Sequence, residues 1–251
     1  MTLVGVSSSV LVDKMKLSCL GGLQPDLVEF YNYPTSSLDA IDRFCVETGV
    51  AMALHTPVPY DEAAPLTRFA PTGPDPDEAH LALRLAIETI RWAAKVGALH
   101  VVVHFPTPYP PYSASALTQF GYRFLDGVQD EAVAGGVTVL VENLSANPLF
   151  RSARDYRDLL ERYPALGLCL DVGHALELDP VRALSDFLEL VGPRVGSTHV
   201  HARGGDPSHL VDAVKLIHHF APRANFVYEP APQADLSPVR KTLQRMREVV
   251  D

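Results

Sequence analysis

The sequence predicts an α/β fold, a single (β/α)₈ barrel that takes up residues 1–251 as one domain. The chain has 251 residues, close to the ~250 that are typical of such a barrel. Short apolar runs alternate along it with segments of helical periodicity, as a parallel sheet with crossover helices requires. Polar side chains also collect where the apolar runs end, and barrel enzymes build their active sites at that edge.

Eight strands are expected, each a short run rich in apolar and β-branched residues. They cover residues 3–7, 27–31, 50–55, 99–104, 138–142, 167–171, 196–201 and 225–229. An open, doubly wound sheet would show the same alternation. No glycine-rich phosphate fingerprint follows the first strand, however, and Gly5 stands alone there, which disfavours a dinucleotide-binding fold.

Helical patterns fill the intervals between the expected strands. They cover residues 37–48, 77–96, 114–134, 152–163, 181–190, 209–220 and 236–250, and residues 10–21 hold at most a short helix. In the clearest pattern, 77–96, Leu81, Leu85 and Trp92 form an apolar face. Gly97 follows its last residue, and glycine commonly ends a helix at that position.

Composition narrows the classes of function. Hydrophobic residues make up 47% of the chain and charged residues 20%, which is ordinary for a soluble globular protein. The three cysteines are far apart without C-x-x-C spacing, and no signal peptide or membrane-spanning run is evident, so a cytoplasmic location without a membrane partner is expected. A net charge of −9 disfavours nucleic acid as a partner, although a local basic patch is compatible with an acidic average.

Six of the eight expected strands end in a residue that can bind a metal ion. These residues are His55, His104, Glu142, Asp171, His201 and Glu229. A strand buried on both faces should be apolar throughout, and burying an unpaired carboxylate costs several kcal/mol. One such residue could be a core group or a helix cap. Six at corresponding positions converge on one place, and a divalent cation is the simplest group that neutralises them.

Side-chain alternation refines this prediction, because residues two apart on a strand share a face. Leu140 therefore points into the barrel together with Glu142, and Cys169 lies one layer beneath Asp171 as a buried apolar residue. His199 and His201 both face inward. His201 is nearer the carboxyl end and is taken as the metal ligand, whereas His199 is interpreted as a core or supporting histidine.

The segments VENLS, LDVGH, HVHARGG and VYEP resemble those of the xylose-isomerase-like barrel superfamily. That group includes sugar isomerases, ketose epimerases and endonuclease IV. The resemblance implies that the metal is bound by four residues: Glu142, Asp171, His201 and Glu229. It also implies that His174, the histidine of the D-x-x-H segment, contacts substrate or a second metal.

The sugar-acting members of the superfamily imply one activity. By this resemblance the chain is a metal-dependent isomerase or epimerase of a small sugar, sugar phosphate or keto-acid, which moves a proton through a metal-stabilised enediolate. Glu142 and Glu229 would be its catalytic acid and base groups. A set of three carboxylates and one imidazole suits Mn²⁺, Mg²⁺ or Co²⁺, and Zn²⁺ also remains a candidate.

The resemblance also implies an alternative, a zinc phosphodiesterase like endonuclease IV that acts on abasic DNA. His55 and His104 match two of the extra histidines of that enzyme, although each can equally bind substrate hydroxyls. Asp206 and His209 are separated by two residues instead of the one that the enzyme's Asp-x-His pattern has. A complete three-zinc site is therefore doubtful, and one or two ions are expected. A second alternative is a barrel without catalysis that has a binding role.

Three further residues are weaker candidates for substrate binding. Arg203 follows the seventh strand closely enough to meet a phosphate or carboxylate group. Tyr60 and Tyr109 lie in the proline-rich segments 56–76 and 105–113, which follow strands and are expected to form the rim of the pocket. The oligomeric state stays open between a monomer and a homodimer.

Overall fold

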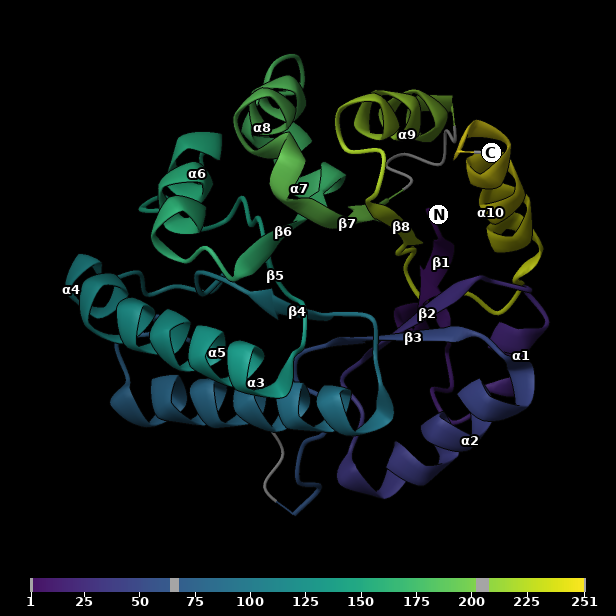
Figure 1. Cartoon of the computed structure of the whole chain (residues 1–251), viewed down its shortest axis with the longest axis horizontal. Coiled ribbons are helices and arrows are strands. Elements are labelled where there is room, and N and C mark those ends of the chain that lie inside the picture. The colour runs from purple at the N-terminus through teal and green to yellow at the C-terminus, as the bar shows by residue number, and fades with distance from the viewer. Residues whose placement is uncertain (1, 64–67, 202–207, 251) are drawn as a thin grey trace.

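Eight parallel strands close into a barrel, in the order in which they occur along the chain (Figure 1). The computed structural model describes residues 2–63, 68–201 and 208–250. The strands are β1 (Val4–Ser7), β2 (Leu27–Tyr31), β3 (Ala51–His55), β4 (Val101–His104), β5 (Val139–Glu142), β6 (Leu166–Asp171), β7 (Val195–Val200) and β8 (Asn225–Tyr228). The predicted (β/α)₈ barrel is thus confirmed, and β1 pairs with β8 to close it.

The helices form a ring outside the barrel (Figure 1). They are α1 (Ser18–Gly21), α2 (Leu38–Thr48), α3 (Pro76–Val96), α4 (Ala114–Ala116), α5 (Tyr122–Gly135), α6 (Ala153–Arg162), α7 (Val172–Leu178), α8 (Ala183–Val191), α9 (Ser208–Phe220) and α10 (Ser237–Val250). Short 3₁₀ turns cover Ser8–Val10, Thr35–Ser37 and Gly192–Arg194, and a π turn over Leu117–Gly121 joins α4 to α5. Within the described residues, no helix is both long and apolar enough to cross a membrane.

Helix α3 shows how local sequence sets the ends of these elements. The side chain of Asp75 accepts a hydrogen bond from the backbone N–H of Asp77, and Pro76 stands in the first turn, where its missing N–H costs nothing. At the other end Gly97 adopts the left-handed conformation, with φ of 70°, which glycine adopts without steric cost. The sequence prediction for this helix is confirmed to within one residue.

Helix α7 was not expected from the sequence. The predicted helices leave residues 172–180 out, but the side chain of Asp171 accepts a hydrogen bond from the backbone N–H of His174 at 2.7 Å and starts a helix there. A helix of this length shows too little periodicity to be recognised in a sequence. Its place matters, because it begins on a predicted metal ligand.

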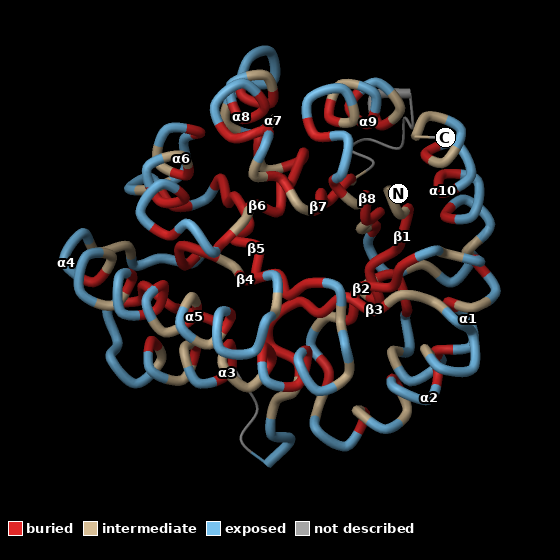
Figure 2. Tube along the Cα trace, in the orientation of Figure 1, coloured by how far each residue is buried: buried red, intermediate tan, exposed pale blue. Residues whose placement is uncertain are grey.

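Most of the apolar core lies between the barrel and the surrounding helices, where the strands and the inner faces of the helices are buried (Figure 2). A second, smaller core fills the barrel itself. It consists of two clusters, one of Leu27, Ala53 and Val227, and one of Val102, Leu140 and Cys169. The predicted inward direction of Leu140 and Cys169 is confirmed.

Two glycines make room for Leu140 inside the barrel. A Cβ atom at either Gly167 or Gly196 would lie 2.7 Å from a methyl carbon of Leu140. The pairing of β6 with β7 shifts by one residue between Leu168 and Cys169, next to these glycines. The interior is therefore packed beneath the carboxyl ends of the strands, and a cavity is left only above it.

Candidate metal centre

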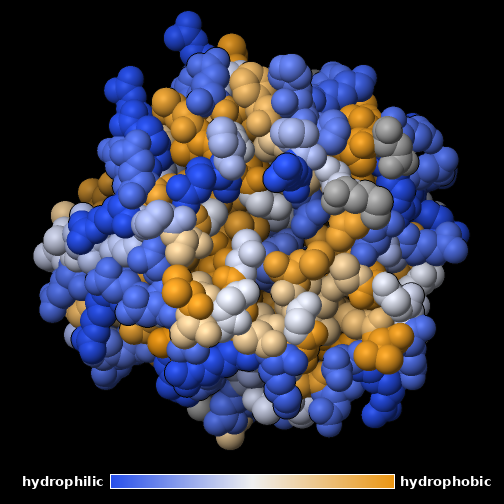
Figure 3. Space-filling view, in the orientation of Figure 1, coloured by the Kyte–Doolittle hydropathy of each residue, from blue (hydrophilic) through white to orange (hydrophobic). Residues whose placement is uncertain are grey.

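A cavity of about 370 Å³ lies at the carboxyl ends of the strands and brings together all six residues that the sequence places there. It is lined by Ser9, Tyr31, His55, His104, Glu142, Asp171, His174, His201, Glu229, Pro230, Ala231 and Pro232. Figure 3 looks onto the opposite end of the barrel, where the strands begin; there apolar and pale residues gather around the centre, and hydrophilic residues lie toward the edge. Among the described lining residues there is no lysine or arginine.

Glu142 is a nearly fully buried carboxylate of the cavity. Its Oε2 lies 2.8 Å from Nε2 of His104 and 3.1 Å from Nε2 of His55, and its Oε1 lies 3.1 Å from Nδ1 of His199. Burial alone would raise the pKa of Glu142, but the His104 and His199 imidazoles beside it hold that pKa well below its usual range. The ionised form of Glu142 is therefore stabilised by the positive charge of neighbouring groups.

Asp171, His201 and Glu229 form the other side of the cavity. Nε2 of His201 lies 2.6 Å from Oδ2 of Asp171 and 3.7 Å from Oε2 of Glu229. Burial lowers the pKa of His201, but the hydrogen bond to Asp171 and the charges of Asp171 and Glu229 together outweigh burial, and the net pKa is raised. Asn143 holds Asp171 in place, because its side chain bonds both the backbone N–H and the backbone carbonyl of Asp171.

His199 lies deeper, between these carboxylates and the interior of the barrel. Its Nδ1 is 3.1 Å from Oε1 of Glu142, 3.3 Å from Oε2 of Glu229 and 3.9 Å from Oδ2 of Asp171. This position is compatible with the sequence interpretation as a core or supporting histidine. The structure places one nitrogen of His199 within reach of all three predicted carboxylate ligands.

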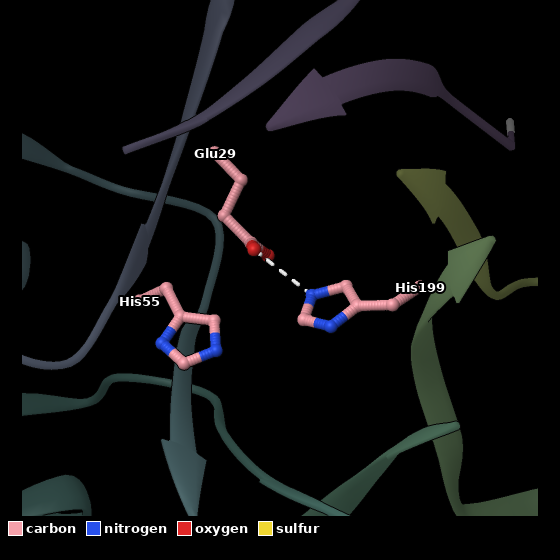
Figure 4. Close-up of side chains that lie close together, drawn as sticks. All are labelled: Glu29, His55 and His199. Carbon is pink, nitrogen blue, oxygen red and sulfur yellow. Dashed lines mark hydrogen bonds and ion pairs between the residues drawn. The ribbon is translucent and has the colours of Figure 1, made fainter. Parts of the chain in front are cut away.

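Glu29, on β2, was not identified from the sequence. It is fully buried, and its Oε1 accepts a hydrogen bond from Nε2 of His199 at 2.9 Å (Figure 4). Burial would raise its pKa, but His199, His100 and His55 lower that pKa below its usual range. A charged residue in the middle of the apolar run LVEFY was the signal that could have revealed it.

The remaining predicted residues lie around or outside the cavity. His174 lines it, and its Nδ1 lies 3.2 Å from Oγ of Ser145. Tyr60 and Tyr109 are not among the lining residues; Tyr31 is the aromatic residue that lines the cavity. Arg203 and Asp206 lie outside the residues that the structure describes, as does the side chain of His209.

The donor set fits a divalent cation. Four groups of described side chains each bring their ligand atoms within 4.8 Å of one another. Three of them include Glu142 or Asp171: His55, His104 and Glu142; Glu142, Asp171 and His199; and Asp171, His201 and Glu229. The fourth, deeper in the barrel, consists of Glu29, His55 and His199. Two ligands of one ion, each bound at ~2.0–2.2 Å, are at most ~4.4 Å apart, so small side-chain movements would close each group around an ion. Glu142 belongs to two groups and could bridge two ions.

Tyr156 ties the rim of this site together. Its buried hydroxyl donates to the carbonyl of Phe105 at 2.7 Å and accepts from the N–H of Leu144 at 2.9 Å, and thereby joins the segments that follow β4 and β5 to α6. Tyr156→Phe leaves both backbone groups unpaired. We expect urea denaturation to show a loss of about 1–3 kcal/mol in the free energy of unfolding.

Tyr122→Phe is the matched control for this prediction. Tyr122 is exposed, and its hydroxyl forms no hydrogen bond within the described part of the chain. Its replacement should change the free energy of unfolding by no more than about 0.5 kcal/mol. Equal losses in the two variants would show that the Tyr156 hydroxyl does not stabilise the rim.

Comparison with known proteins supports the resemblance seen in the sequence. The family model described as "Xylose isomerase-like TIM barrel" matches residues 13–246. No curated protein matches the chain by sequence.

Several solved structures share the fold. A D-tagatose 3-epimerase-like protein superposes with a TM-score of 0.78 at 17% identity, over 99% of this chain and 98% of that one. D-psicose 3-epimerase from Clostridium cellulolyticum H10 gives 0.76 at 14% identity, over 100% of both chains. A xylose isomerase-like barrel from Mycobacterium smegmatis, in complex with magnesium, gives 0.72 at 14% identity, over 100% of this chain and 98% of that one. At these identities the likeness shows the fold.

Proposed function

Since the chain belongs to the xylose isomerase-like TIM barrel family, we propose that it is a divalent-metal-dependent sugar isomerase or epimerase. Its substrate would be a small sugar, sugar phosphate or keto-acid. The observation that carries the proposal is the placement of Glu142 and Glu229, two carboxylates from β5 and the end of β8 that reach one cavity and approach the same nitrogen of His199. The fold relatives include a D-tagatose 3-epimerase-like protein and D-psicose 3-epimerase.

The two carboxylates supply what an epimerisation requires. A proton must leave a carbon beside a carbonyl from one face and return from the other, so one base is needed on each face. Glu142 is nearly fully buried among three imidazoles, and Glu229 is partly exposed at the mouth of the cavity. An isomerisation between adjacent carbons would use the same groups to carry the proton along the chain of the sugar.

Other residues of the cavity would bind and orient the substrate. His104 and His174, both partly exposed, can donate hydrogen bonds to sugar hydroxyls. Tyr31 supplies an aromatic wall. A divalent cation held by Glu142, Asp171, His201 and Glu229 would neutralise negative charge that develops on two neighbouring substrate oxygens.

A second candidate, a zinc phosphodiesterase that acts on abasic DNA, is supported by one observation. His55, His104 and Glu142 form a group of ligand atoms separate from Asp171, His201 and Glu229, so two ions could be bound side by side. The described residues that line the cavity include no lysine or arginine, which argues against it, because nucleic acid binding depends on lysine and arginine contacts to phosphates.

Metal removal tests the proposal. The protein should be stripped with a chelator, reloaded with Mn²⁺, Mg²⁺, Co²⁺ or Zn²⁺, and incubated in D₂O with D-fructose, D-psicose or D-tagatose. We expect deuterium to enter the carbon beside the carbonyl only in the reloaded protein, with a loss of at least ~10²-fold after stripping.

The other outcomes distinguish the alternatives. Nicking of an abasic duplex by the zinc-loaded protein, without exchange in any ketose, would favour the phosphodiesterase. Metal binding with neither activity would indicate a barrel with a binding role. Exchange that is undiminished in the stripped protein would rule out the role given to the metal.

A further inference from the structure

Glu29 is a carboxylate inside the barrel to which the proposed reaction gives no part. It is fully buried on β2, at the level of Ala53, its register partner on β3. A buried carboxylate is costly, and an apolar side chain of similar size would fill this space at lower cost. Its presence calls for an explanation other than packing.

The two carboxylate oxygens of Glu29 have different contacts. Its Oε1 accepts the hydrogen bond from Nε2 of His199. Its Oε2 lies 3.6 Å from Nε2 of His100, and neither of these two atoms has a hydrogen-bond partner among the described residues. Figure 4 shows Glu29 and His199 pointing toward one another from opposite sides of the barrel interior. Among the described residues, the one hydrogen bond of the Glu29 carboxylate is therefore directed at His199.

The hydrogen bond between Glu29 and His199 determines which nitrogen of the His199 ring faces the cavity. A carboxylate only accepts hydrogen bonds, so Nε2 of His199 must carry the hydrogen. Nδ1 is then turned toward Glu142, Glu229 and Asp171, at 3.1, 3.3 and 3.9 Å. Histidines at metal centres almost always donate their second ring N–H to a carboxylate or carbonyl, which fixes the ring and its tautomer.

We propose that Glu29 is a positioning residue of the metal centre, which holds His199 with Nδ1 presented to the three carboxylates of the cavity. It acts from beneath the site and touches no substrate. This inference rests on the proposed function, because it assumes that the cavity binds the divalent cation of that function. It adds His199 to that centre beside His201, and gives Glu29 the task of orienting it.

Glu29→Gln is the variant that tests this role, because glutamine has the same shape but can either donate or accept. Nε2 of His199 is then no longer required to carry the hydrogen. We expect the dissociation constant for Mn²⁺ or Zn²⁺, measured by calorimetric titration without substrate, to rise about 10- to 100-fold. The melting temperature of the metal-free variant should stay within a few degrees of the parent.

His100→Gln is the matched control. His100 is buried beside the other oxygen of the same carboxylate, and no contact of it with His199 or the cavity residues is found in the described chain. Its replacement should leave the metal dissociation constant within about twofold. Unchanged metal affinity in Glu29→Gln, or an equal loss in both variants, would overturn the proposal and leave Glu29 a structural residue.

A second measurement does not depend on any Glu29 variant. In ¹⁵N-labelled, zinc-loaded protein, with His199 assigned through a His199→Asn variant, Nε2 of this ring should carry hydrogen. A bare Nε2 would overturn the proposal. If the parent binds metal and passes these tests but exchanges no proton of any ketose, the proposed function fails and the role of Glu29 stands.

Discussion

Replacing Glu142 with glutamine should lower proton exchange into ketose by about 10³- to 10⁴-fold while the barrel stays folded, because an amide cannot accept a proton at neutral pH. Glutamine keeps the shape of the side chain and one acceptor oxygen. His104 and His55 contact Oε2 of Glu142 and His199 contacts Oε1, so replacing one of these oxygens with an NH₂ group changes the hydrogen bonding of the imidazoles that face it. Initial rates in D₂O and thermal melting of the metal-free protein measure the two effects.

Glu131→Gln is the control for this variant. Glu131 belongs to α5 and pairs with Arg91 on the outer surface, so the same chemical change there should leave the exchange rate within about twofold. Exchange that persists in Glu142→Gln at the parent rate would remove Glu142 from the proposed acid and base groups.

Glu229→Gln should lower the rate of epimerisation by about 10³-fold, but the activity that remains should differ from that of Glu142→Gln. With one base on each face of the substrate, loss of Glu229 leaves Glu142 able to remove the proton that faces it. One epimer should then continue to take up deuterium, and the other should not. Nuclear magnetic resonance of each pure epimer, incubated separately, makes this comparison.

Glu248→Gln serves as the control for Glu229. Glu248 is exposed on α10, where it accepts a hydrogen bond from Gln244, and its change should leave exchange in both epimers as in the parent. Equal loss of exchange from both epimers in Glu229→Gln would favour a single-base mechanism, and undiminished epimerisation would mean that Glu229 is not a base.

Much of the fold could be predicted because it depends on patterns that are local in the sequence. Eight apolar runs separated by helical periodicity require parallel pairing, and the observed strand ends agree with the predicted ends to within two residues. Helix α7 escaped prediction because its start is determined by the side-chain cap of Asp171, and its length is too short for periodicity to show. The π turn over Leu117–Gly121, inside the helix predicted at 114–134, likewise leaves no clear pattern.

The site could be predicted only in part. Polar residues at strand ends are visible in a sequence, and the structure brings His55, His104, Glu142, Asp171, His201 and Glu229 to one cavity. Depth inside the barrel is not visible, because it depends on how staggered strands meet across the interior. The sequence therefore leaves His199 open between a core and a supporting histidine and gives no role to Glu29, although the two are bonded to each other beneath the cavity.

Asp171 uses its two carboxylate oxygens for different purposes. One accepts the hydrogen bond that starts α7, and the other faces His201. A cation that binds Asp171 therefore pulls on the residue that caps α7. Conversely, a displacement of α7 moves Asp171, a predicted metal ligand. Helix α7 packs against α8, which belongs to the outer ring. The Asp171 side chain is thereby one mechanical link between the centre of the barrel and its perimeter, beside the backbone that joins β6 to α7.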